Sequence, residues 1–82
     1  MALKDDFAAA QTRVQSLTSR PSNADLLNLY ALFKQGSIGD VSGKKPGRLD
    51  LKGRAKYEAW ESKKGMSADD AMQAYIDLVG RL

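Results

Sequence analysis

Residues 26–35 read Leu26-Leu27-Asn28-Leu29-Tyr30-Ala31-Leu32-Phe33-Lys34-Gln35, a run dominated by leucine and aromatic side chains. On a helix with 3.6 residues per turn, these apolar side chains cover more than half of the circumference. A helix of this kind buries its apolar surface against several neighbours. The segment therefore predicts the central helix of a helical domain.

The residues on both sides of this run predict where the helix begins and ends. Ser22 stands three residues before Asp25, as in a capping box, although Asp is a shorter partner than Glu. Pro21 ends any earlier helix, because proline donates no backbone hydrogen bond and pushes its predecessor out of the helical region. Gly36 and Gly39 follow the run. We therefore expect the central helix to begin after Ser22 and to end at these glycines.

Upstream of Pro21, residues 4–17 have the pattern of an amphipathic helix. Asp5 and Asp6 stand in its first turn, where the helix dipole favours acidic side chains. Apolar residues recur at helical spacing at Phe7, Ala10, Val14 and Leu17.

Two further helices are expected downstream. Asp50 can cap a helix that runs to about residue 63, and its apolar residues near one side are Leu51, Ala55, Ala59 and Trp60. Gly65 follows two lysines and suits the left-handed position after a helix. Ser67 can cap the last helix, whose apolar residues are Met72, Tyr75, Ile76 and Val79. Because no segment shows the alternation of a strand, the sequence predicts an all-α protein of four helices.

The connection over residues 37–50 contains several glycines and one proline, and we expect an ordered but irregular loop. Its glycines do not form a phosphate-binding loop. Gly39 and Gly43 are one residue too close for the G-x-x-x-x-G-K pattern, and Lys45 stands where that pattern needs Ser or Thr.

The composition favours a binding protein over an enzyme. The chain has 82 residues, of which 43% are apolar, so we expect a single domain over residues 1–82. It contains no Cys and no His, which excludes zinc fingers, thiol nucleophiles and imidazole bases. We expect no metal site and no cofactor. The first residues carry no signal peptide and no segment is apolar enough to span a membrane, so we expect a soluble cytoplasmic protein.

The positive charge is concentrated in residues 41–64. This segment has a net charge of +5, whereas the rest of the chain has a net charge of −2. One interpretation is a solvated loop and helix surface, and the other is a site for an anion. Nucleic acid is the less favoured anion, because the acidic remainder of the chain would weaken a broad phosphate footprint. A compact phosphorylated ligand fits the pattern better.

Aromatic and basic residues combine in one pattern. Tyr30, Phe33 and Lys34 project from one neighbourhood of the central helix, and Lys52 and Lys56 lie four residues apart on the third. If the helices bring the lysines together, the ammonium groups can follow phosphate oxygens while an aromatic face stacks on a base. The alternative is that the aromatic residues belong to the core and the lysines are only solvated, and the spacing alone leaves both open.

Several segments together form one specific pattern. They are residues 29–35 (Leu29-Tyr30-Ala31-Leu32-Phe33-Lys34-Gln35), residues 52–60 (Lys52-Gly53-Arg54-Ala55-Lys56-Tyr57-Glu58-Ala59-Trp60), and residues 39–40, 46–50, 64–67 and 71–76. In these segments, and over nearly its whole length, the chain resembles the acyl-CoA-binding protein family. The order and the intervals match without an insertion. This resemblance implies a four-helix up-down-down-up bundle that binds medium- to long-chain fatty acyl-CoA esters.

The resemblance also implies roles for individual residues. Tyr30, Lys34 and Lys56 would meet the 3′-phosphate and ribose, Phe33 would stack on adenine, and Lys52 and Tyr75 would complete the headgroup site. Leu27 and Ala55 would line the path of the acyl chain, although core packing is also open for Leu27. The implied protein is a monomeric carrier and pool former without enzymatic activity, stable membrane insertion or nucleic-acid binding. Transient contact with acyl-CoA-using enzymes is also implied.

Three residues depart from the family pattern. Phe33 stands where tyrosine is common, which keeps the aromatic face but removes a hydroxyl. Tyr57 stands where tryptophan is usual, and Gln15 stands where a basic residue often lies near the ligand. We expect the affinity for the headgroup to be reduced by the loss of that ionic contact.

Overall fold

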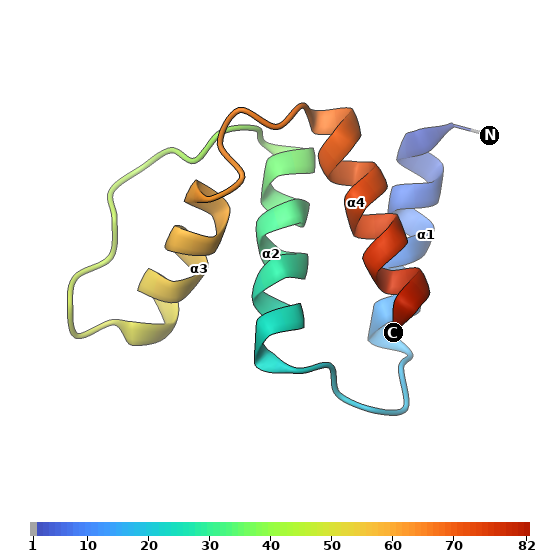
Figure 1. The fold of residues 1–82 in the computed structure, drawn as a ribbon, viewed down its shortest axis with the longest axis horizontal. Helices are drawn as coiled ribbons and strands as arrows, with labels where there is room; N and C mark the ends of the chain where they lie inside the picture. Colours follow the sequence, from blue (N-terminus) through green and yellow to red (C-terminus); the bar gives the residue numbers. More distant parts are fainter. Residues whose placement is uncertain (1) are drawn as a thin grey trace.

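The computed structural model describes residues 2–82, and within them the regular structure consists of helices alone. These are α1 (Leu3–Gln15), α2 (Asn23–Ser37), α3 (Leu51–Glu61) and α4 (Ala68–Arg81), shown in Figure 1. The predicted all-α class and the predicted order of four helices are confirmed.

The helices run in the up-down-down-up order that the family resemblance implies. In Figure 1, α1 and α4 run in one direction and α2 and α3 run in the other. Because α2 and α3 are parallel, the chain must travel back along the length of a helix before α3 can begin. This requirement explains the long connection over residues 38–50.

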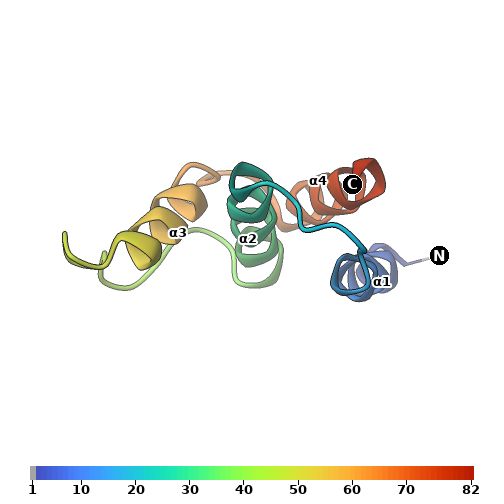
Figure 2. The same cartoon turned by 90° about the horizontal axis from the view of Figure 1, so that it is seen from below.

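The central position predicted for α2 is confirmed. Its backbone approaches α4 on one side and α3 on the other, whereas α1 approaches only α4 and α3 approaches only α2. Figure 2 looks roughly along the helices and shows α3 on one side of α2 and the α1–α4 pair on the other. The molecule is consequently flat, with extents of 40 × 29 × 15 Å.

The apolar core lies among α1, α2 and α4. Phe7 and Tyr75 meet edge to face with ring centroids 5.1 Å apart, an arrangement that aromatic quadrupoles favour. The buried apolar cluster around this pair comprises Phe7, Ala10, Leu29, Leu32, Ala71, Met72, Tyr75, Leu78 and Val79. No residue of α3 belongs to this cluster.

The three predicted helix caps are present. The Ser22 hydroxyl accepts a hydrogen bond from the Asp25 N–H, and the Ser67 hydroxyl accepts one from the Asp70 N–H, both at 3.1 Å. The Asp50 carboxylate accepts a hydrogen bond from the Gly53 N–H at 3.0 Å. Each cap supplies a partner to one of the backbone donors that a helix leaves unpaired at its start.

The structure corrects two details at helix ends. α1 ends at Gln15 and α3 ends at Glu61, each two residues before the predicted limit. α2 ends at Ser37, between the two glycines predicted to mark its end, and Gly36 in its last turn permits a close approach to α4. A Cβ atom at this position would lie 3.1 Å from Met72 Cγ. The left-handed position predicted for Gly65 is confirmed by its φ of +91°.

The prediction that Leu51 belongs to the apolar side of α3 is wrong. Its side chain is 74% exposed, whereas Trp60, near the other end of the same helix, is buried. The reason is that α3 has only one helical neighbour, and its first turn extends away from the core.

Candidate functional site

Two lysines from different helices meet at one aromatic ring. Lys34 of α2 places its Nζ atom 5.7 Å from the centroid of the Tyr30 ring, and Lys56 of α3 places its Nζ atom 5.4 Å from the same centroid. Both distances lie within the range of cation–π attraction. The tertiary structure therefore brings together Tyr30, Lys34 and Lys56, the three residues that the family resemblance assigns to one part of the ligand.

The positive charge of this pair has no carboxylate partner among residues 2–82. The two ion pairs in that range join Lys45 and Arg54 to Glu58, at 3.1 and 3.8 Å, and involve neither Lys34 nor Lys56. Two ammonium groups beside one ring repel each other, so an anion bound between them would lower the electrostatic energy. The arrangement is suited to hold phosphate.

Trp60 supports Lys34 from α3. The Nζ atom of Lys34 lies 5.6 Å from the Trp60 ring as well, so two aromatic rings flank the ammonium group. The indole of Trp60, predicted to lie on the apolar side of this helix, is buried, and its Nε1–H donates a hydrogen bond to the Gly39 carbonyl at 2.8 Å. The hydroxyl of Tyr57 donates to the Gly43 carbonyl at 3.2 Å. These two bonds attach α3 to the 38–50 connection.

A buried amide links three parts of the chain behind the lysine pair. The side chain of Gln35 is 1% exposed, and its Nε2–H₂ group donates to Asp40 Oδ1 at 2.9 Å and to the Met66 carbonyl at 2.8 Å. Asp40 Oδ1 also accepts the Gly65 N–H at 2.8 Å. The bond from Gly65, followed by that from Gln35, lowers the pKa of the Asp40 carboxyl below its ordinary value.

We call Gln35, Asp40, Gly65 and Met66 the polar hub. The hub joins the end of α2 to the start of the 38–50 connection and to the α3–α4 connection, and it therefore fixes α3 beside α2. Sequence reasoning assigned it no role. The available signal was an amide in the most apolar helix, where a buried polar side chain must find partners.

Tyr75 belongs to the apolar core among α1, α2 and α4, and Phe33 packs against that core. The half-buried Phe33 ring has its centroid 6.1 Å from that of Phe7. Tyr75 is only 5% exposed, and burial raises the pKa of its hydroxyl.

The remaining predicted residues are less closely grouped. Lys52 is exposed one turn before Lys56 on α3, and its ammonium group does not pair with the Tyr30 ring as those of Lys34 and Lys56 do. Leu27 lies one turn before Tyr30 on α2 and is partly buried, as is Ala55 on α3. The sequence suggested that the ammonium groups of Lys34, Lys52 and Lys56 could converge. In the structure, those of Lys34 and Lys56 meet at the Tyr30 ring and that of Lys52 does not.

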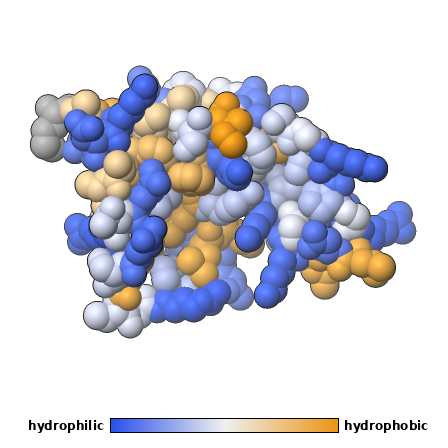
Figure 3. Space-filling view, turned by 180° about the vertical axis from the view of Figure 1, so that it is seen from behind, coloured by the Kyte–Doolittle hydropathy of each residue, from blue (hydrophilic) through white to orange (hydrophobic). Residues whose placement is uncertain are grey.

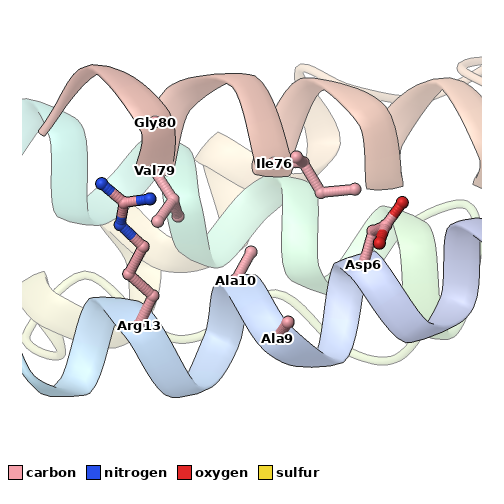
Figure 4. A pocket seen from close by; sticks show the side chains of 7 residues that line it. All are labelled: Asp6, Ala9, Ala10, Arg13, Ile76, Val79 and Gly80. Atoms are coloured by element: carbon pink, nitrogen blue, oxygen red, sulfur yellow. The ribbon is translucent and has the colours of Figure 1, made fainter.

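Two cavities lie away from this cluster. One of about 280 Å³ lies between α1 and α4, as Figure 4 shows, and is lined by Asp6, Ala9, Ala10, Arg13, Ile76, Val79 and Gly80. The other, of about 320 Å³, lies at the α1–α2 connection and the end of α4. Neither contains a charged cluster comparable to the lysine pair, so we assign the candidate site to the lysine pair.

Residues 2–82 contain no group of three or more His, Cys, Asp or Glu side chains placed to hold a metal ion. Within the same part of the chain, no helix has both the length and the apolar character needed to cross a membrane.

Comparison with known proteins gives a consistent result. Residues 4–79 match the family described as acyl CoA binding protein. The chain is 55% identical over 82 residues to acyl-CoA-binding protein homolog 1 of Caenorhabditis elegans, covering all of this chain and 93% of the relative. It is 54% identical over 77 residues to the acyl-CoA-binding protein homolog of Drosophila melanogaster, covering 94% of this chain and 90% of the relative.

Solved structures agree with these relatives. The crystal structure of acyl-CoA-binding protein 2 from Oryza sativa superposes with a TM-score of 0.94 at 38% identity, covering 98% of this chain and 87% of that one. The solution structure of the acyl CoA binding protein from Babesia bovis has a TM-score of 0.83 at 41% identity, and the match covers 100% of this chain and 93% of that one.

Proposed function

Because this chain belongs to the acyl-CoA-binding protein family, it binds and carries acyl-CoA esters, and we propose that Tyr30, Lys34 and Lys56 hold the headgroup of the ester. The family consists of binding proteins and carriers, and the prediction that the chain is not an enzyme is thereby confirmed. The lysine pair supports our assignment of the headgroup site, because it is a concentration of positive charge without a carboxylate partner among residues 2–82.

The headgroup of coenzyme A carries a 3′-phosphate, and lysine suits such a group. Its ammonium is a mobile point charge that can follow phosphate oxygens. Each contact of this kind is a charge-assisted hydrogen bond worth about 1.5–3 kcal/mol. In the proposed site Lys34 and Lys56 contact the phosphate, Tyr30 lies against the ribose, and Phe33 stacks on adenine. Lys52 and the hydroxyl of Tyr75 are proposed to complete the headgroup contacts.

The acyl chain is proposed to run past Leu27 and Ala55, which are both partly buried on the facing helices α2 and α3. Burial of apolar surface contributes about 0.8 kcal/mol per methylene, so eight sequestered methylenes would supply about 6 kcal/mol before ordering costs. Affinity should therefore rise with chain length, and we propose medium- to long-chain esters as the ligands.

The cellular role that follows is that of a monomeric cytoplasmic carrier that maintains a pool of acyl-CoA. Release of the ligand would occur in transient contact with enzymes that use it. The domain is proposed to occupy residues 1–82, to require no cofactor, and to bind no nucleic acid.

Calorimetric titration with a series of acyl-CoA esters, coenzyme A alone and free fatty acid tests the function. Tight binding should require both parts of the ligand, and it should strengthen with acyl length. A nucleic-acid-binding domain would instead bind oligonucleotides with a steep dependence on salt and would ignore the acyl length. Equal retention of fatty acid and of its coenzyme A ester would contradict the proposed site.

Substitution of the two lysines tests the assignment of the headgroup residues. Lys34→Ala or Lys56→Ala should weaken acyl-CoA binding by at least about tenfold, because each removes a charge-assisted contact. Helical content, measured by circular dichroism, should not change.

The matched control is Lys44→Ala, since Lys44 lies in the same basic segment but is exposed and outside the cluster. This control should change the affinity by less than about threefold at physiological salt, where surface charges are screened. Equal losses in all three variants would mean that general electrostatics, and not the proposed site, attracts the ligand.

A further inference from the structure

Two leucines stand exposed at one extremity of the molecule. Leu49 is 99% exposed and Leu51 is 74% exposed, and they flank Asp50 at the start of α3. Figure 3 shows an apolar patch at the edge of the molecule on the α3 side, bordered by hydrophilic side chains. Single exposed leucines are common on proteins. Here two leucines stand on either side of one residue at a protruding end, and neither packs against the core.

The surroundings of these leucines are basic. Lys44, Arg48 and Lys52 are exposed in the adjoining loop and first helical turn, and no ion pair among residues 2–82 involves them. The nearby acidic groups are already engaged. Asp50 caps the positive end of α3, and Glu58 is paired with Lys45 and Arg54.

The size of the patch decides between possible partners. A stable protein interface buries about 800 Å² on each partner around a packed apolar centre, which two leucines at a narrow end do not supply. Attachment to a lipid surface needs a much smaller apolar area than a stable protein interface. A few apolar side chains that enter the boundary between headgroups and acyl chains, together with lysines and arginines near anionic lipids, give reversible attachment.

We propose that this end of the molecule, formed by Leu49, Leu51, Lys44, Arg48 and Lys52, docks reversibly on an anionic lipid surface. The two leucines enter the interfacial region, and the basic side chains meet the lipid phosphates. The contact is peripheral, in keeping with the absence of a membrane-spanning helix among residues 2–82. Lys52 is shared with the proposed headgroup site, but the contact itself requires no acyl-CoA and is tested without it.

Co-sedimentation with vesicles tests the proposal. The full chain is mixed with vesicles of phosphatidylcholine, with or without phosphatidylserine, in the absence of acyl-CoA. Binding should require phosphatidylserine and should decrease as salt is raised, since screening weakens attraction between surface charges. Binding to neither kind of vesicle, or equal binding to both, would overturn the proposal.

Substitutions separate the apolar and the charged contributions. The double variant Leu49→Ser/Leu51→Ser should weaken vesicle binding by on the order of tenfold, and Lys44→Gln/Arg48→Gln should do the same. The apolar control is Ile38→Ser, which removes a 59% exposed side chain at the C-cap of α2, outside the proposed surface. The charge control is Lys4→Gln/Arg81→Gln, which removes two exposed cations from α1 and α4. Equal losses in the controls would overturn the proposal.

A fluorescent label reports which end of the molecule meets the lipid. Because the chain contains no cysteine, Leu49→Cys and Ile38→Cys each provide a single attachment point for an environment-sensitive dye. On addition of phosphatidylserine vesicles, the dye at position 49 should shift to the blue and be quenched by lipids brominated on their acyl chains. The dye at position 38 should not respond. A blue shift at position 49 that grows with protein concentration without vesicles would indicate self-association and would overturn the proposal.

Discussion

The α1–α2–α4 layer and the α3 arm, by which we mean α3 with the 38–50 connection, are held in place by different forces. α2 and α4 each bury five residues, almost all apolar, whereas α3 buries only Trp60. The layer is stabilised by burial of apolar surface. The arm is attached to the layer by the buried indole of Trp60 and by the hydrogen bonds of the polar hub. The hydrogen bonds of Trp60 and Tyr57 join α3 to the 38–50 connection within the arm.

This difference matters because the candidate site spans both regions. Tyr30 and Lys34 belong to the layer, and Lys56 belongs to the arm. Their juxtaposition therefore depends on the hydrogen bonds that fix α3 beside α2. Segments with few buried apolar contacts open locally at a lower free energy than the core. We expect α3 to open more readily than α2 or α4, and the position of Lys56 to move with it.

The largest effect is expected from a cavity in the layer. Leu32→Ala removes a buried core side chain and should lower the free energy of unfolding by about 2–5 kcal/mol, a large part of the stability of a small domain. Denaturant unfolding followed by circular dichroism measures this loss. The matched control is Leu51→Ala, which removes the same atoms from an exposed position and should change stability by less than about 0.5 kcal/mol. Comparable losses in both variants would contradict the distinction between the two regions.

A smaller effect is expected from the polar hub. Gln35→Met keeps the size of the side chain but removes both hydrogen bonds of Nε2, leaving the Met66 carbonyl and Asp40 each without one donor. The expected cost is about 1–3 kcal/mol. Amide hydrogen exchange should accelerate more in α3 than in α4, because the hub attaches the arm.

The control for this variant is Gln73→Met. It removes an exposed hydrogen bond between Gln73 and Asp77 within α4 and should have little effect on either helix. If Gln35→Met accelerated exchange equally in α3 and α4, the hub would belong to the layer and not to the attachment of the arm.

Within the layer, Phe33 offers a test through binding. Phe33→Ala should weaken acyl-CoA binding by a factor corresponding to about 1–3 kcal/mol, the usual contribution of stacking between an aromatic ring and a base. Phe33→Tyr should bind nearly as well as the parent, because the aromatic face is retained. Calorimetry on folded variants measures both. Equal losses in the two would argue against stacking by this ring.

The smallest effect is expected from the pH dependence of Asp40. Because hydrogen bonds lower its pKa below the ordinary value of 3.8, the carboxylate stabilises the folded protein above that value, and this contribution is lost as the pH falls through the lower folded pKa. Asp40→Asn should therefore be less stable than the parent at neutral pH.

The difference between Asp40→Asn and the parent should shrink as the pH falls below 3.8, because protonation of Asp40 removes its charge. Denaturant unfolding over this range measures it. A difference that stayed constant with pH would mean that geometry, and not the charge of Asp40, stabilises the hub.

Much of the candidate site could be predicted from the sequence, but its grouping could not. Helical spacing placed Tyr30 beside Lys34 on one helix, and the family resemblance added Lys56. The pairing of Lys56 with the same ring depends on the parallel packing of α2 and α3, for which no local spacing gives a rule. The polar hub was not predicted because Gln35 and Met66 are 31 residues apart in the chain.

The sequence by itself determined the four helices, their caps and the basic segment, because helical hydrogen bonds and capping bonds join residues only three or four positions apart. Only the tertiary structure decided which lysines meet, why Gly36 lies inside a helix and why Leu51 faces solvent. Those outcomes depend on partners distant in the chain, and on the fact that α3 packs against a single neighbour.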